Sequence, residues 1–225
     1  MARRVSEETG VVVYLVIAPY PVDLTHLIPA LGRAKAVELH RSALDLAGRW
    51  VDEQRAVAIG EVGRPHFPVE VEVAAASEEV FRYALEVARD AGCPAVVHSA
   101  DLDSEGYRSL ASLAAQTSFP LGKLVKHYAR SIVEPPDLAG IVPSYVARRE
   151  SVRDALNQPG PWFLETDFLD DPRRPGAVLD LATIPRRAEA LAARGTEWVE
   201  KLRTPFVESV RAVYGITPLR SEPHP

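Results

Sequence analysis

The chain of 225 residues is poor in several features, and each shortage excludes a class of protein. Its one cysteine, Cys93, excludes an intramolecular disulfide framework and a cysteine-cluster zinc site. Its longest apolar run, Val11 to Pro19, is about half of the roughly 20 residues that span a bilayer. The first residues have no apolar core behind Arg3 and Arg4, so a signal peptide is not expected. These features predict a cytoplasmic protein with no membrane segment.

Basic residues are also in deficit, since the formal net charge is −5 and the isoelectric point is about 5.7. This balance argues against a broad basic groove for nucleic acid but leaves room for a local basic site. Thermolabile residues are scarce, with one Asn, one Met and three Gln, which is typical of a heat-adapted source. Arginine outnumbers lysine 22 to 4, however, and a GC-rich genome produces the same bias.

Apolar, β-rich runs alternate with helical patterns along the chain, which predicts βαβ units and a mainly parallel sheet. One helix is expected to start at Ser77 as N-cap, another to start at Thr183, and a last one to run from Thr204 to Gly215. Residues 1–216 are expected to form a single domain, followed by a flexible, proline-rich tail over 217–225. The expected strands cover residues 11–17, 55–61, 95–98, 123–127, 140–142 and 162–167.

Four of these six strands end in a residue that can bind a metal ion: Glu61, His98, His127 and Asp167. In a parallel barrel all strand C-termini meet at one rim, so these side chains should converge. Taken singly, a strand-end histidine is more often a hydrogen-bonding residue, and a lone carboxylate is more often a helix cap. Four of them at strand ends favour a site for zinc, manganese or another divalent ion.

The segments around these residues resemble the strand-end motifs of the TatD family of metal-dependent hydrolases. They are Ala58-Ile59-Gly60-Glu61-Val62-Gly63, Ala95-Val96-Val97-His98-Ser99, Val125-Lys126-His127-Tyr128 and Glu165-Thr166-Asp167. The closing Val213-Tyr214-Gly215-Ile216 also resembles the family's C-terminus, so the match runs from about Val11 to Ile216. Residues 18–21, 64–67 and 170–176 are most similar to an archaeal branch of uncharacterised members.

The resemblance implies an α/β fold of the TIM-barrel type, (β/α)8, in the amidohydrolase superfamily. It implies that Glu61 bridges two metal ions, zinc, manganese or magnesium, and that His98 and His127 bind one of them. It also implies that Asp167 binds the other ion and acts as the catalytic base.

Two features depart from the family pattern. The family's first strand carries His-x-His, whereas no two of the six histidines here are two residues apart. Residues 11–17 match the family's second strand, so we expect a barrel that is incomplete at its N-terminus. The missing strand would lie upstream of the stated start, or the chain would be a fragment. After Gly63 many members have Leu-Asp-Tyr, where this chain has Arg64-Pro65-His66.

Three arginines follow the expected metal-bearing strands: Arg64, Arg173 and Arg174. Guanidinium groups suit phosphate oxygens, so these residues are candidates for substrate binding, together with His66 in the loop after Glu61. Surface salt bridges to Asp170 or Asp171 are an equally good interpretation of the arginines.

Three functions therefore stay open. The first is a metal-dependent phosphoesterase or deoxyribonuclease that acts on a small phosphoester or single-stranded nucleic acid, which the acidic net charge favours over duplex DNA. The second is an amidohydrolase that acts on a small cyclic amide or ester. The third is a non-catalytic barrel with an incomplete metal site.

Overall fold

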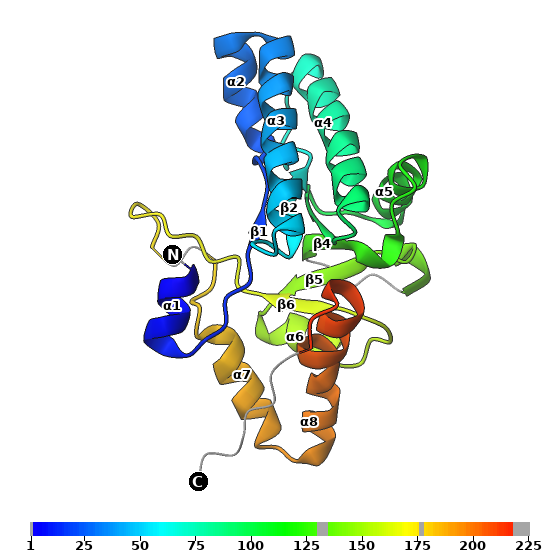
Figure 1. Cartoon of the computed structure of the whole chain (residues 1–225). Helices are drawn as coiled ribbons and strands as arrows, with labels where there is room; N and C mark the ends of the chain where they lie inside the picture. The colour runs from blue at the N-terminus through cyan, green and yellow to red at the C-terminus, as the bar shows by residue number, and fades with distance from the viewer. Residues whose placement is uncertain (1, 130–134, 176–177, 218–225) are drawn as a thin grey trace. The chain divides into compact units, whose positions relative to one another are not determined.

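The computed structural model describes residues 2–129, 135–175 and 178–217 (Figure 1). Its strands are hydrogen-bonded neighbours in chain order, from β1 to β6, and the pairs β1–β2, β2–β3 and β5–β6 are parallel. This confirms the predicted α/β fold with a parallel sheet. It also agrees with an incomplete barrel, because a full (β/α)8 barrel has eight strands. The strands are β1 (Val16–Ile17), β2 (Ala58–Gly63), β3 (Ala95–His98), β4 (Leu124–Ala129), β5 (Val142–Val146) and β6 (Phe163–Glu165).

The chain divides into two compact units. The first comprises Met1–Ala100 and Ser109–Val125, and the second comprises Asp101–Arg108 and Lys126–Pro225. Two elements contribute residues to both units: α5 (Ser104–Gln116) and β4. Each unit has its own packing and is described by itself.

In the first unit, helices α3 and α4 pack against each other and against β2. Their contact is close at Gly48, where an added Cβ would lie 2.8 Å from a methyl group of Val87. β2 is buried at nearly every position, as expected for a parallel strand that is covered on both faces. The helices of this unit are α1 (Ala2–Thr9), η1 (Pro21–Asp23), α2 (Leu24–Leu31), α3 (Arg33–Asp52), α4 (Val71–Asp90) and η2 (Leu121–Lys123).

In the second unit, buried Tyr145 and Trp162 lie at the centre of an apolar cluster that Leu202 joins. Its last helical segments are π-helical turns, and Gly215 ends them in the left-handed conformation at φ 70°, which favours glycine. The helices are η3 (Pro135–Leu138), α6 (Arg149–Ala155), α7 (Thr183–Ala192), α8 (Thr196–Arg203), η4 (Thr204–Glu208) and η5 (Val210–Tyr214).

The prediction of a strand over residues 11–17 is wrong for most of its length. Only Val16 and Ile17 form β1, and the apolar residues before them are exposed, with Val11 at 58% and Tyr14 at 50%. A strand needs a hydrogen-bonded neighbour, and β1 pairs with β2 alone among the described strands. The other five strands lie within a few residues of their predicted positions.

The helix predictions are confirmed at Thr183, where α7 begins, and at Gly215, where η5 ends. The predicted start at Thr204 is wrong, because the helical run begins at Thr196 with α8 and continues directly into η4.

The prediction of Ser77 as an N-cap is wrong. Helix α4 begins at Val71, and Ser77 lies buried inside it, where its hydroxyl donates to the carbonyl of Val73 at 2.9 Å. The helix begins six residues before the serine, because Val73 and Ala76 in this first segment are buried and pack it against the rest of the unit.

Cys93 is buried, and burial raises the pKa of its thiol, which is typical of a packing residue rather than a nucleophile. None of the helices in the described ranges is both long and apolar enough to cross a membrane. The single domain over 1–216 stays a prediction, and residues 218–225 of the expected tail lie outside the described residues.

Candidate metal centre

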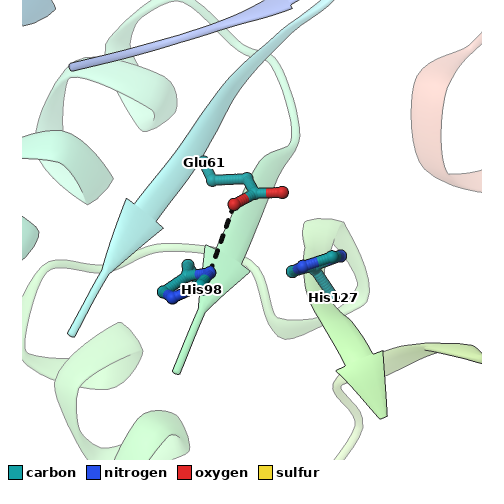
Figure 2. Close-up of side chains that lie close together, drawn as sticks. All are labelled: Glu61, His98 and His127. Atoms are coloured by element: carbon teal, nitrogen blue, oxygen red, sulfur yellow. Dashed lines mark ion pairs between the residues drawn. The ribbon is translucent and has the colours of Figure 1, made fainter. Parts of the chain in front are cut away.

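In the first unit, Glu61 and His98 form an ion pair at the ends of neighbouring strands. The pairing of β2 with β3 shifts between Gly60 and Val62, so Glu61 lies at a bulge, a feature common beside functional sites. Its Oε2 lies 3.2 Å from Nδ1 of His98 (Figure 2). His98 is buried, whereas Glu61 is partly exposed. The structure thus brings together two of the four predicted ligands, within one unit.

The backbone after the bulge in β2 passes close to the backbone of His98 at Gly63. The amide of Arg64 donates to the carbonyl of His98 at 2.9 Å, which draws the two strands together after the bulge. A Cβ on Gly63 would lie only 2.3 Å from that carbonyl oxygen, and Gly63 has a φ of +133°, which L side chains rarely adopt. Glycine is therefore required where the chain passes His98.

The other nitrogen of His98 faces two further side chains of this unit. Nε2 of His98 lies 2.9 Å from Nδ1 of His66 and 3.3 Å from the hydroxyl of Tyr20. In the contact between the two imidazoles, one nitrogen must donate and the other must accept, so a single proton lies between Nδ1 of His66 and Nε2 of His98. His66, which the sequence suggested as a substrate contact, and Tyr20 therefore both contact a predicted metal ligand.

In the second unit, His127 is held by a carboxylate. Its Nδ1 lies 2.6 Å from Oε2 of Glu165, whose other oxygen accepts from the backbone amide of Tyr128. A carboxylate can only accept, so Nδ1 of His127 carries a proton, and in the neutral ring the lone pair is on Nε2. Nε2 lies 3.6 Å from Oδ1 of Asp167. Figure 2 also draws His127, which projects from β4.

Glu165 is the site residue that the sequence analysis missed. A carboxylate that fixes one ring nitrogen of a histidine is the usual outer partner of a metal-binding imidazole. The signal was present, because Glu165 and Asp167 are two residues apart in the predicted strand over residues 162–167, and such residues are expected to share one face. The strand-end pattern predicts Asp167, because it indicates a ligand at the last residue of each strand and not the residue that contacts the ligand from behind.

Two residues beside His127 have strained backbone. Tyr128 has a φ of 55° and Asp167 a φ of 49°, both in the left-handed region that non-glycine residues seldom occupy. Such residues cost of order 1–3 kcal/mol and cluster at active sites. Tyr128 follows the predicted ligand His127, and Asp167 is itself a predicted ligand, so the strained backbone lies at the predicted site.

The donors in each unit fit a divalent metal ion. Each unit supplies one imidazole and one carboxylate: His98 with Glu61, and His127 with Asp167. Nitrogen and oxygen donors of this kind suit zinc, manganese and related ions. That all four residues hold metal in a single centre stays a prediction.

The three arginines expected to bind substrate phosphate each have a carboxylate partner. Arg64 forms a forked pair with Glu78, at 2.7 and 2.9 Å. Arg173 and Arg174 lie 3.2 and 3.6 Å from Asp171, and these arginines lower the pKa of its carboxyl group. The pairs with Asp171 are those that the salt-bridge interpretation expects, and phosphate binding stays a prediction.

Comparison with known proteins places the chain in a family. The family described as TatD related DNase matches residues 1–215. An uncharacterized protein of Methanocaldococcus jannaschii is 31% identical over 211 residues, which are 93% of this chain and 75% of the relative.

Two solved structures are similar to the chain. A variant of a phosphotriesterase-like lactonase from Deinococcus radiodurans has a TM-score of 0.62 and 17% identity, over 95% of this chain and 76% of that one, a likeness of fold. A TatD-like protein from Archaeoglobus fulgidus has a TM-score of 0.46 and 16% identity, over 88% of this chain and 86% of that one. With the family match over nearly its whole length, the chain belongs to the TatD family of metal-dependent hydrolases, as its strand-end motifs predicted.

Proposed function

We propose that the chain hydrolyses phosphoester bonds, as a phosphoesterase or deoxyribonuclease, with a small phosphoester or single-stranded nucleic acid of the cytoplasm as substrate. The observation that carries this proposal is the arrangement of His127, whose Nδ1 is held by Glu165 while its Nε2 faces Asp167. A ring fixed in this way presents a lone pair in a set direction, which is what a metal ligand requires. Membership of a family described as DNase-related supports the phosphodiester as the bond that is cut.

Glu61, His98, His127 and Asp167 would hold two divalent ions, zinc, manganese or magnesium. Bound there, the ions would lower the pKa of a water molecule and polarise a phosphoryl oxygen of the substrate. Glu61 would bridge the two ions, and the two histidines would bind one of them. Glu165 acts behind His127 as a positioning residue, because its oxygens bind Nδ1 of that ring and the amide of Tyr128.

Asp167 is the proposed general base. Its carboxylate would accept a proton from the attacking water as the new P–O bond forms. The same proton would pass to the leaving oxygen as the old P–O bond breaks, so Asp167 ends the cycle ionised. His66, Arg64, Arg173 and Arg174 would contact the substrate, the arginines through its phosphate oxygens once their present carboxylate partners release them.

The test is metal-stimulated hydrolysis of a single-stranded oligonucleotide and of bis(p-nitrophenyl) phosphate. Purified chain stripped by chelation should regain activity with zinc, manganese or magnesium, and Asp167→Asn should lose it by about 10²-fold or more, the scale of a lost general base. Asp90→Asn is the matched control, since Asp90 is exposed at the end of α4 and pairs with Arg89. It should retain full activity.

Inactivity of the metal-loaded chain on DNA, RNA and small phosphoesters would refute the proposal. A cyclic ester and a cyclic amide belong in the same panel, because the same donor set would serve an amidohydrolase. Under half an equivalent of bound metal, with no activity after reconstitution, would instead favour a non-catalytic barrel.

A further inference from the structure

A basic pocket lies among the helices of the second unit. It has a volume of about 560 Å³ and is bordered by residues of α6, α7 and α8. None of its lining residues in the described ranges is a carboxylate. Its cationic side chains are Arg149, Arg153, Arg186, Arg187 and Arg194. In a chain with a net charge of −5, five guanidinium groups around one cavity are a local concentration that overall composition does not explain.

Most of these arginines are not neutralised. Arg153 pairs with Asp154 at 3.0 Å, and Arg194 stacks on the ring of Trp198 at 3.7 Å from its centroid. Arg149, Arg186 and Arg187 have no ion-pair partner among the residues that the structure describes. Several like charges around one cavity repel one another, and this repulsion is relieved when an anion enters.

Arg187 supplies a second observation that points to a ligand. Its Nη1 atom is shielded from solvent and has no hydrogen-bond partner in the described part of the chain. Desolvation and the neighbouring charge of Arg149 lower the pKa of this guanidinium, so the protein carries an unfavourable, unpaired cation there. A buried donor left without an acceptor costs about 1–3 kcal/mol, more when it is charged. A bound anion would accept that hydrogen bond.

Apart from Thr183, the remaining wall of the pocket is apolar. Val152 and Leu191 line it, together with the ring of Trp198. Pockets of about 300–1,000 Å³ with an apolar lining and a few convergent polar groups are the usual sites of small organic ligands. The volume and the mixed lining suit a compact ligand better than a long polymer.

We propose that this pocket binds a small ligand that carries two or more phosphate groups. Guanidinium forks match phosphate oxygens in a bidentate way, and the charge of five arginines around one cavity is better matched by two or more phosphates than by one. The apolar wall leaves room for an organic group such as a base. Free polyphosphate and a nucleoside diphosphate share this chemistry. The site uses none of the proposed metal ligands and does not depend on the proposed hydrolysis.

Isothermal titration of the full chain, with EDTA present to remove metal, tests the proposal. The probes are inorganic tripolyphosphate, adenosine diphosphate, adenosine and a single-stranded oligonucleotide. Tripolyphosphate or the diphosphate should bind, adenosine should not, and Arg187→Leu should weaken binding at least about ten-fold, equal to about 1.4 kcal/mol. Arg186→Gln changes an exposed side chain, cannot compromise the core, and should weaken binding several-fold.

Arg203→Ala is the matched control. Arg203 ends α8 outside the pocket and lies near Glu200 and Glu208, so its loss should leave the affinity unchanged. Thermal unfolding of Arg187→Leu without ligand adds an independent readout. The midpoint should stay equal or rise, because the variant removes a partly buried cation whose Nη1 atom is shielded from solvent and has no acceptor among the described residues.

The two sources of phosphate are told apart by the titrations. Tighter binding of the diphosphate than of tripolyphosphate assigns a nucleotide, and the reverse order assigns inorganic polyphosphate. Three results would overturn the proposal: no binding of either ligand, the same loss of affinity in Arg203→Ala as in Arg187→Leu, or tighter binding of the oligonucleotide than of both small ligands.

Discussion

His98 and His127 are both predicted metal ligands, yet the two units hold them in different ways. Nδ1 of His98 lies 3.2 Å from Glu61, and its Nε2 contacts an imidazole and a phenol, each of which can donate or accept. Nδ1 of His127 lies 2.6 Å from Glu165, whose other oxygen accepts from the amide of Tyr128. The second unit therefore holds its histidine through one short contact to a fixed carboxylate, whereas the contacts of His98 are longer and divided among three side chains.

The largest effect is expected when the carboxylate that contacts Nδ1 of His127 is removed. Glu165→Gln should lower metal affinity and activity by about 10–100-fold, the usual effect of losing such a partner, because the amide can present a donor to Nδ1. Metal titration monitored by competition with a chromogenic chelator measures the affinity directly.

Glu197→Gln serves as the control for that substitution, since Glu197 lies exposed on α8 beside Lys201. It should behave as the unmodified chain does. If Glu165→Gln bound metal normally and lost only thermal stability, Glu165 would be a structural residue and not a positioning one.

The second prediction concerns the glycine that holds the first ligand. Gly63→Ala should destabilise the fold by roughly 1–3 kcal/mol, since its φ is disfavoured and its Cβ would meet the carbonyl oxygen of His98. Gly122→Ala, which meets nothing within 4 Å, should change stability little. Urea unfolding of both variants gives the difference, and equal stabilities would show that the strands at His98 can move apart.

The third prediction concerns the contribution of His66 to metal binding by His98. His66→Ala should weaken metal binding by about ten-fold or less, because Glu61 and Tyr20 still contact the His98 ring. The same chelator competition measures it. A loss of metal affinity as large as that in Glu165→Gln would show that the two histidines depend equally on the side chains that contact them.

The fourth prediction is a loss of stability in alkali that arises in the second unit. Burial, and then the charge of Glu165, raise the pKa of Tyr214 from 10 to about 12. The unfolded chain therefore loses this proton first, so the stabilisation is complete below pH 10 and is lost as pH rises toward 12. Tyr214→Phe should flatten the decline in unfolding midpoint between pH 10 and 12. A decline that stayed as steep would assign it to other groups.

The smallest expected effect is that of the Arg64–Glu78 pair in the first unit. A double-mutant cycle with Arg64→Ala and Glu78→Ala should give a coupling of about 0.2–1 kcal/mol, as partly exposed pairs do. The KM of Arg64→Ala then separates two roles. A raised KM with unchanged kcat supports phosphate binding, and unchanged constants support a salt bridge alone.

The sequence predicted β2 to β6 within a few residues, because short apolar runs between turn signals are typical of buried strands. The same pattern over residues 11–17 predicted a strand of which only Val16 and Ile17 form part. Glu61, His98 and His127 lie on strands as predicted, and Asp167 lies two residues after β6.

The sequence could not show that Ser77 lies inside a helix, because tertiary packing of α4 overrides a local cap. Nor could it pair Arg64 with Glu78 or Glu165 with His127, since these contacts join residues whose proximity only the folded chain determines.

The run Val11-Val12-Val13-Tyr14 has a practical consequence for anyone who handles this protein. These β-branched and aromatic side chains are 37–58% exposed, and they directly precede the two-residue strand at one end of the strand order. Apolar segments with high β-propensity and no charge template intermolecular pairing when they are accessible. We therefore expect concentration-dependent self-association in solution that begins at this segment, and a charged substitution at Val12 to suppress it.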